Sequence, residues 1–454
     1  MKRKAVRSDD QKGLKTARGS TATSVGTKVQ GALGAGSDAV SVTKRVYWIG
    51  AFAPKMRTFD VILKTPNGTT YNAYLVRGSE GVAVIDTVKA ECAEQFFSRL
   101  EAVADYGEIK SIVLNHLEPD HSGALPELMR RAPQATLYIS EAAPLMLKAL
   151  LNDKDIAYTP VTTNDCVSLG DRTLRFLHTP YLHWPDTQCT YLDEEGVLFS
   201  GDVFGCHYCD ERLFNDLVGD FRFSFEYYYD HIMRPFKQHV LRALELIDPL
   251  QINLVAPAHG PILRDHPRLY IERYRELSTP RPRLHLGREH SEKTMIIFYI
   301  SSYQNTTNMA EAIRDGAAEV GGFRISLYDL EGGEIEPFID LVEEADAILV
   351  GSPTINGDAV KPVWDLLSSF ARINVKGKVG GAFGSYGWSG EAVRMIDDRL
   401  RGLKMRVPLA GLRIKLVPSE DELEACRSYG RDVGSFLMGK PHVRELDMSQ
   451  LPVD

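Results

Sequence analysis

The chain has 454 residues, 44% of them hydrophobic and 25% charged, and this length predicts two or more domains with a sizeable buried core. The net charge of −8 argues against nucleic-acid binding, and no run approaches the ~18 consecutive apolar residues that a transmembrane helix needs. The six cysteines are too scattered for a disulfide framework, which favours a cytoplasmic location.

The start of the chain is basic and poor in large apolar residues. Residues 1–44 contain nine Lys or Arg against three Asp or Glu, and therefore carry a net charge of +6. Such a segment cannot bury enough apolar surface to fold alone. We therefore predict that residues 1–43 form a disordered basic extension. No apolar stretch follows Met1, so a secretory signal is not indicated.

Short β-rich runs dominate residues 44–277, the first predicted domain. Strands are expected at 59–63, 71–76, 82–86, 111–115, 135–139, 173–178, 188–192, 197–200 and 252–256. Helices are expected at 92–103 and over 225–246, where Pro235 should kink or break the helix. Many strands with interspersed helices favour a two-sheet α/β sandwich.

A Pro-rich and charged run, residues 278–293, predicts a linker to a second domain. In residues 294–440, strands at 295–300, 325–330, 347–350, 379–383 and 411–417 alternate with helices such as 307–320. This alternation is typical of a flavodoxin-like, doubly wound parallel sheet of about five strands. Residues 441–454 are left as a C-terminal tail.

The densest polar motif lies directly after a buried strand. His116, Glu118, Asp120 and His121 supply four potential metal ligands within six residues. The alternative is a polar loop with a capping Asp, but so dense a cluster without a metal would face severe desolvation and like-charge costs. Three further candidates follow in order, two of them at strand ends: His183, Asp202 and His259.

The loop resembles that of the metallo-β-lactamase superfamily, whose hydrolases carry His-x-His-x-Asp-His. Here Glu118 occupies the second His position, and this variant resembles the flavodiiron proteins, or A-type flavoproteins, whose metal is iron. The resemblance implies a metallo-β-lactamase-like αββα sandwich followed by a flavodoxin-like domain. It also implies that one iron is held by His116, Glu118 and His183, the other by Asp120, His121 and His259, and that Asp202 bridges them.

Three loops at strand ends of the second domain resemble the FMN-binding loops of flavodoxins. Hydroxyls and backbone amides at a helix N-terminus form a phosphate cradle, although Ser and Thr clusters are also ordinary helix caps. No Gly-x-Gly-x-x-Gly follows a strand, so a nicotinamide-binding domain is not indicated. The candidate FMN contacts are Ser301, Ser302, Tyr303, Gln304, Asn305 and Thr306, then Pro353, Thr354, Ile355, Asn356 and Gly357, and then Ser385, Tyr386, Gly387, Trp388 and Gly390.

Some features near the metal motif carry less weight. Cys206 and Cys209 form a lone C-x-x-C with no partner pair, and His207 between them is a candidate for lining the metal pocket. The run from Tyr227 to Tyr229 is interpreted as core or interface packing and not as a radical relay.

The resemblance implies an oxidoreductase that reduces dioxygen to water, nitric oxide to nitrous oxide, or both. Electrons would pass through FMN from an external donor, which could be rubredoxin, a reduced deazaflavin or a dedicated reductase. It also implies a head-to-tail homodimer or a dimer of dimers, with no nucleic-acid or membrane partner.

Two alternatives stay open. One is a zinc hydrolase with a fused flavin domain, against which Glu118 and the flavin loops argue. The other is a non-catalytic electron-transfer or gas-sensing flavoprotein with a vestigial metal site, against which seven filled ligand positions argue.

Overall fold

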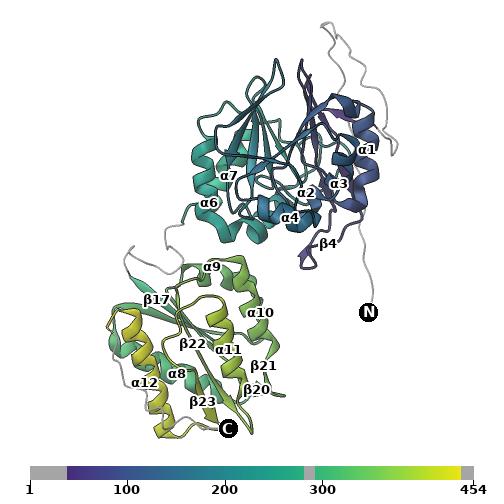
Figure 1. Ribbon diagram of the computed structural model, residues 1–454. Coiled ribbons are helices and arrows are strands. Elements are labelled where there is room, and N and C mark those ends of the chain that lie inside the picture. The colour runs from purple at the N-terminus through teal and green to yellow at the C-terminus, as the bar shows by residue number, and fades with distance from the viewer. Residues whose placement is uncertain (1–37, 281–291, 441–454) are drawn as a thin grey trace, which may run out of the picture. The chain divides into compact units, whose positions relative to one another are not determined.

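The computed structural model describes residues 38–280 and 292–440 (Figure 1). The predicted tail, most of the predicted linker and residues 1–37 of the predicted extension lie outside these ranges. Residues 40–41 form strand β1 (Val40–Ser41), which pairs antiparallel with β2 (Val46–Trp48). The folded part therefore begins before residue 44, because this short pairing adds an edge strand to a sheet.

Two mixed sheets form the first domain. The first has the order β1-β2-β7-β8-β9-β10-β11 and the second the order β12-β13-β14-β15-β16. The strands of the first sheet after β2 are β7 (Tyr74–Arg77), β8 (Val82–Ile85), β9 (Ile109–Val113), β10 (Thr136–Ser140) and β11 (Thr159–Val161). Those of the second are β12 (Cys166–Ser168), β13 (Thr173–His178), β14 (Gln188–Leu192), β15 (Val197–Gly201) and β16 (Leu254–Pro257).

Alternation along the strands places apolar side chains on both faces of each sheet. In β8, Ala83 and Ile85 join the core shared with Phe199 of β15, whereas Val84 packs with the helices. Successive side chains of a strand point to opposite faces, so both faces of such a strand need a cover. Figure 1 shows the two sheets between helices α1 and α3 on one side and α6 and α7 on the other. This is the predicted αββα sandwich.

The helices of this domain are short. They are α1 (Ala93–Glu101), α2 (Pro119–Ser122), α3 (Leu125–Arg131), α4 (Pro144–Leu151), α5 (Arg222–Tyr228), α6 (Lys237–Ile247) and α7 (Pro267–Ser278). Single turns occur at η1 (Ala90–Cys92), η2 (Tyr106–Glu108), η3 (Tyr229–Met233, a π-helix) and η4 (Arg234–Phe236). The predicted break at Pro235 is confirmed, because α5 and α6 are separated by η3 and η4.

Two strand predictions were wrong. Residues 59–63 form no single strand but a hairpin of β4 (Thr58–Phe59) and β5 (Leu63–Lys64), with positive φ at Asp60 and Val61. Residues 71–76 are split between β6 (Thr69–Tyr71), which pairs with β3 (Ala51–Ala53), and β7. Asn72 lies between them because its backbone N–H donates to Ala258 O, at 2.7 Å, instead of to a strand neighbour.

The second domain is built on one parallel sheet with the order β18-β17-β19-β22-β23. Its strands are β17 (Lys293–Tyr299), β18 (Phe323–Asp329), β19 (Ala347–Gly351), β22 (Val379–Tyr386) and β23 (Leu412–Lys415), with a small hairpin of β20 (Thr354–Ile355) and β21 (Asp358–Ala359). Its helices are α8 (Asn305–Val320), α9 (Glu336–Glu344), α10 (Lys361–Ser369), η6 (Phe370–Arg372), α11 (Glu391–Gly402) and α12 (Glu420–Leu437).

This strand order confirms the predicted flavodoxin-like fold. Alternate residues of β17 serve two cores: Met295 and Ile297 pack under α8 and α12, whereas Ile296 and Phe298 pack under α9, α10 and α11. Among the helices that the structure describes, none is both long and apolar enough to cross a membrane.

Helices α8 and α12 approach closely at two glycines. A Cβ on Gly316 of α8 would lie 1.9 Å from Arg427 O, and a Cβ on Gly430 of α12 would lie 2.0 Å from Ile313 O. Real atoms cannot approach so closely, so any side chain here pushes the helices apart. The contact bears on the candidate FMN site because α8 begins inside the first of the predicted flavin loops.

We therefore expect Gly430→Ala to destabilise the second domain by about 1–3 kcal/mol through overpacking. Gly402→Ala, at the end of α11 where a Cβ would meet nothing within 4 Å, is the matched control and should be as stable as the parent or more stable by up to ~1 kcal/mol, because Ala favours the helix more than Gly does. Denaturant unfolding followed by circular dichroism measures the difference. Equal stability of the two variants would contradict the close-packing argument.

Candidate functional site

All seven predicted metal ligands lie at the ends of neighbouring strands. His116 and Glu118 follow β9, and Asp120 and His121 belong to α2 immediately after them. The other three come from the second sheet: His183 from the β13–β14 connection, Asp202 directly after β15, and His259 after β16. Residues 143 positions apart in the sequence are thereby brought into one cluster.

Four of the seven form one group with metal-ligand spacing: His116, Glu118, His183 and Asp202. Glu118 Oε2 lies 3.1 Å from His116 Nε2 and 2.9 Å from His183 Nε2. Asp202 Oδ2 faces the same two imidazoles, at 3.7 Å and 3.6 Å.

A second group consists of Asp120, His121 and His259. Asp120 Oδ1 lies 3.3 Å from His121 Nε2, and Asp120 Oδ2 lies 3.0 Å from His259 Nε2. The other oxygen of Asp202, Oδ1, is 3.2 Å from His121 Nε2 and 3.5 Å from His259 Nε2. Asp202 thus presents one carboxylate oxygen to each group.

Several of these buried atoms lack a hydrogen-bond partner. Within the described ranges, both carboxylate oxygens of Asp120, Asp202 Oδ2 and His121 Nε2 lie at ion-pair distance from other members of the cluster, but none of these contacts has hydrogen-bond geometry. An unsatisfied buried donor or acceptor is costly, and a carboxylate more so. Metal ions at these atoms would remove the penalty, and a mixture of imidazole and carboxylate donors suits iron. The residues present therefore fit a di-iron centre.

The charges in the cluster compensate one another. Burial opposes protonation of His121, but the neighbouring Asp120 and Asp202 carboxylates raise its pKa to about 10. Burial also works against ionisation of Glu118, but hydrogen bonds from His116 and His183 hold its pKa well below the usual range. Without metal the cluster is a set of buried ion pairs, and a metal ion would take the place of the imidazole protons.

Outer groups orient two of the imidazoles. His116 Nδ1 donates to Asp186 Oδ2 at 3.1 Å, and His259 Nδ1 donates to the backbone oxygen of Thr70 at 2.7 Å. Such contacts set the ring orientation and the nitrogen that faces a metal. Sequence reasoning missed Asp186, although it follows His183 by only three residues.

Tyr228 also contacts the site, and its interpretation as a packing residue was incomplete. Its hydroxyl donates to Asp202 Oδ1 at 3.0 Å, and its side chain is buried. Only the orientation of α5 turns this tyrosine toward Asp202. Tyr229 does pack, against Tyr274 at a ring distance of 5.0 Å.

His207 lies beside the candidate ligand His259, with its ring 5.2 Å from that of His259 and its Nδ1 3.0 Å from Thr69 Oγ1. Its Nε2 has no hydrogen-bond partner among the described residues, and burial lowers its pKa well below the ordinary value. Burial raises the pKa of both Cys206 and Cys209, which favours the protonated thiol at neutral pH.

Asp60 is a further residue that sequence reasoning missed. It lies at the tip of the β4–β5 hairpin, where partial burial and the negative charges of Glu118 and Asp120 raise its pKa. A straight strand over 59–63 would not have carried this side chain to the metal groups.

The three predicted flavin loops lie at the carboxyl ends of β17, β19 and β22, the central strands of the parallel sheet. The first and third are joined by a hydrogen bond between Thr306 Oγ1 and Ser385 Oγ, at 2.9 Å. Ser301 Oγ is buried and has no partner in the part of the chain that is described. The aromatic side chains of Tyr303 and Trp388 are 86% and 83% exposed. Such a sheet edge is where doubly wound folds bind their ligands.

The two domains match different protein families. Residues 69–260 match the family described as ODP family beta lactamase, and residues 297–430 match flavodoxin. The chain is 61% identical over 414 residues to a type A flavoprotein, fprA, of Rhodobacter capsulatus, covering 91% of this chain and 94% of the relative.

More distant relatives cover similar lengths. A flavo-diiron protein, FprA2, of Clostridium acetobutylicum is 36% identical over 87% of this chain and 98% of its own length. A nitric oxide reductase of Moorella thermoacetica is 35% identical over 88% of this chain and 99% of its own length.

The solved structure of rubredoxin oxygen:oxidoreductase from the anaerobe Desulfovibrio gigas superposes with a TM-score of 0.62 at 28% identity, covering 89% of this chain and 99% of that one. The two family matches lie in the same order as the two folded domains, and the identity to the relatives extends along most of the chain. The chain belongs to the flavodiiron protein family, the type A flavoproteins.

Proposed function

We propose that the protein is an oxidoreductase that reduces dioxygen to water, nitric oxide to nitrous oxide, or both, at a di-iron site supplied with electrons through FMN. The position of Asp202, with one oxygen toward each group of ligands, carries the proposal. The names of the relatives agree with it: one is a nitric oxide reductase and one a rubredoxin oxygen:oxidoreductase.

We assign residues 44–277 to iron binding and residues 294–440 to FMN binding. One iron would be held by His116, Glu118 and His183, and the other by Asp120, His121 and His259. Asp202 would bridge them. The donors and their burial support this assignment, because each group combines imidazoles with at least one carboxylate.

When bound, the two irons supply the redox chemistry and FMN supplies electrons one or two at a time. Four electrons and four protons convert dioxygen to two waters, and two of each convert two nitric oxide molecules to nitrous oxide and water. The protein holds the donors in place. Asp186 and Thr70 orient His116 and His259, and Tyr228 holds Asp202.

The side of the cluster near Glu118 is the more accessible one. The His183 side chain is 18% exposed, whereas the other ligands are at most 10% exposed. We infer that substrate enters on this side, past Asp60 on the β4–β5 hairpin. His207, held neutral by burial, lies on the His259 side and would fill the pocket there.

We assign FMN to the three loops at the carboxyl edge of the parallel sheet. Ser301, Ser302 and Thr306 would bind the phosphate. The half-buried ring of Tyr386 or the exposed ring of Tyr303 or Trp388 would flank the isoalloxazine. The remaining contacts would be Gln304 and Asn305, Pro353, Thr354, Ile355, Asn356 and Gly357, and Ser385, Gly387 and Gly390.

An external donor would reduce the FMN. The printed sequence has a single C-x-x-C, whose Cys206 is buried, so no rubredoxin-type site is evident in it. Rubredoxin, a reduced deazaflavin and a dedicated reductase all stay candidates. The head-to-tail homodimer or dimer of dimers, the cytoplasmic location, and the lack of nucleic-acid or membrane partners stay predictions.

Metal analysis and turnover test the function. Purified protein should contain about two iron ions and one FMN per chain, and photoreduced protein should consume dioxygen or nitric oxide in anaerobic stopped flow. Zinc in place of iron after expression in iron-replete medium would favour the hydrolase alternative. Iron and FMN without turnover of either gas would favour a sensing or electron-transfer role.

The bridging role of Asp202 distinguishes it from the other ligands. Asp202→Ala should lower the iron content at both positions, whereas His183→Ala should lower it mainly at one, since only Asp202 faces both groups. Iron analysis together with Mössbauer spectra would separate the two results. Equal losses from both variants would contradict the bridging assignment.

Ser301→Ala tests the phosphate cradle. If the unpartnered Ser301 hydroxyl donates to the FMN phosphate, its removal should weaken FMN binding about tenfold or more, since a hydrogen bond to a charged group is worth ~1.5–3 kcal/mol. Ser368→Ala on the exposed side of α10 is the control. Fluorescence titration of the FMN-depleted chain gives both affinities, and an unchanged affinity for Ser301→Ala would place the phosphate elsewhere.

A further inference from the structure

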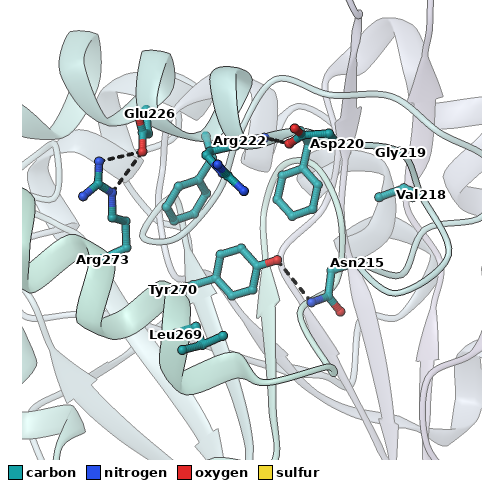
Figure 2. Close-up of a pocket in the computed structure, with 11 residues that line it drawn as sticks. Asn215, Val218, Gly219, Asp220, Arg222, Glu226, Leu269, Tyr270 and Arg273 are labelled. Carbon is teal, nitrogen blue, oxygen red and sulfur yellow. Dashed lines mark hydrogen bonds and ion pairs between the residues drawn. The ribbon is translucent and has the colours of Figure 1, made fainter.

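A cavity of about 680 Å³ lies in the first domain between α7 and the segment that leads into α5 (Figure 2). None of the seven metal ligands and none of the flavin loops line it. Its volume is within the range of small-molecule sites, roughly 300–1,000 Å³. The function proposed above makes no use of this cavity.

Aromatic rings form one wall of the cavity. Phe221 and Tyr270 are stacked, with ring centroids 5.8 Å apart and planes only 9° from parallel. Phe225 meets Tyr270 edge-on, with ring centroids at 5.4 Å. The hydroxyl of Tyr270 accepts a hydrogen bond from Asn215 Nδ2 at 3.3 Å, which leaves its own proton available to an occupant. A flat aromatic wall with a polar rim favours a planar ligand.

The charged side chains of the lining are not equivalent. Arg273 is neutralised, because it donates to Glu226 Oε1 through Nε at 3.0 Å and Nη2 at 2.6 Å, and it also pairs with Glu276. Arg222 is exposed and makes no ion pair with any residue that the structure describes. Figure 2 shows its guanidinium pointing into the space above Tyr270.

A carboxylate lies beside this free charge. The carboxylate of Asp220, on the same rim, accepts from the backbone N–H of Arg222 at 2.9 Å. An occupant would therefore meet an aromatic surface, an unpaired guanidinium, and a carboxylate that can accept from ring N–H groups.

We propose that this cavity binds a planar heteroaromatic anion of mononucleotide size, with its ring against the wall of Phe221 and Tyr270 and its anionic group on Arg222. Guanidinium groups bind phosphate and carboxylate through two parallel hydrogen bonds, and stacking on an aromatic face adds to the affinity. Asp220 favours rings that carry amino or N–H donors.

The cavity shares a helix with the metal centre. Arg222, Phe225 and Glu226 of α5 line it, and Tyr228, one turn further along the same helix, donates to Asp202. Phe225 also packs on Tyr274, whose ring lies 4.7 Å from that of Phe204, two residues after Asp202. The proposed site thus contains none of the metal ligands, but helix α5 and packed aromatic side chains connect it to them.

Adenosine monophosphate and adenosine are the probes that test this site. The full chain, loaded with iron and FMN, is titrated with each by isothermal calorimetry while FMN fluorescence reports any release of flavin. We expect one molecule of the nucleotide to bind per chain without release of FMN, and adenosine to bind at least about tenfold more weakly, since it lacks the group that Arg222 would hold.

Variants then assign the binding to the cavity. Arg222→Met should weaken binding of the nucleotide about tenfold or more and change adenosine binding little, whereas Tyr270→Leu should weaken both. Arg212→Met, which removes an exposed arginine that pairs with Asp210 and lies outside the cavity, is the control. Thermal unfolding of each variant shows that it is folded.

Three results would overturn the proposal. The first is no binding of either probe up to millimolar concentration. The second is nucleotide binding that Arg222→Met and Arg212→Met leave equally unchanged, which places the ligand elsewhere on the surface. The third is release of FMN in step with binding, which places the nucleotide in the flavin loops.

Discussion

The structure depends on one carboxylate, that of Asp202, which has to stay ionised while it is fully buried. Burial alone would favour its neutral form, but the imidazoles of His121, His116 and His259 hold its pKa well below the usual range. Removing any of these partners leaves an uncompensated charge inside the protein. The strand ends around Asp202 must therefore stay close to one another, because the imidazoles on some of them compensate the carboxylate charge on another.

The sandwich meets this constraint by bringing two sheets to a common edge. The candidate ligands after β9 and in α2 belong to the first sheet, and those after β13, β15 and β16 border the second. The core between the two sheets therefore sets the distance between these two sets of ligands. That core contains Phe199, Tyr74 and Val113, which lie in or beside the strands that carry the ligands. Packing in such a core is close, and a shift of one sheet would pull apart the members of both candidate ligand groups, because each group combines residues from the two sheets.

The second domain also places its candidate binding site at the edge of a closely packed sheet, but the predicted ligand there is a phosphate. A phosphate needs donors and no competing carboxylates, and the loops after β17 and β22 present hydroxyls that are joined by the Thr306–Ser385 hydrogen bond. The close crossing of α8 and α12 at Gly316 and Gly430 holds the helix that begins in the first of these loops. In both domains, therefore, a tightly packed scaffold supports a polar strand edge.

The amino-acid sequence alone predicts the two folds, the family and the candidate metal ligands. The His-x-Glu-x-Asp-His spacing at residues 116–121, the later His183, Asp202 and His259, and the alternation of strands and helices beyond residue 294 predict the ligands, the two folds and the family, because ligand chemistry and strand periodicity are local properties. What depends on tertiary structure was not predictable in this way. Four contacts join residues whose neighbours in the sequence give no information about the partner. They are the approach of Asp60 to Glu118, of Tyr228 to Asp202, of Asp186 to His116, and of the free Arg222 guanidinium to Tyr270. Such contacts are set by how helices and hairpins pack, and only the tertiary structure decides them.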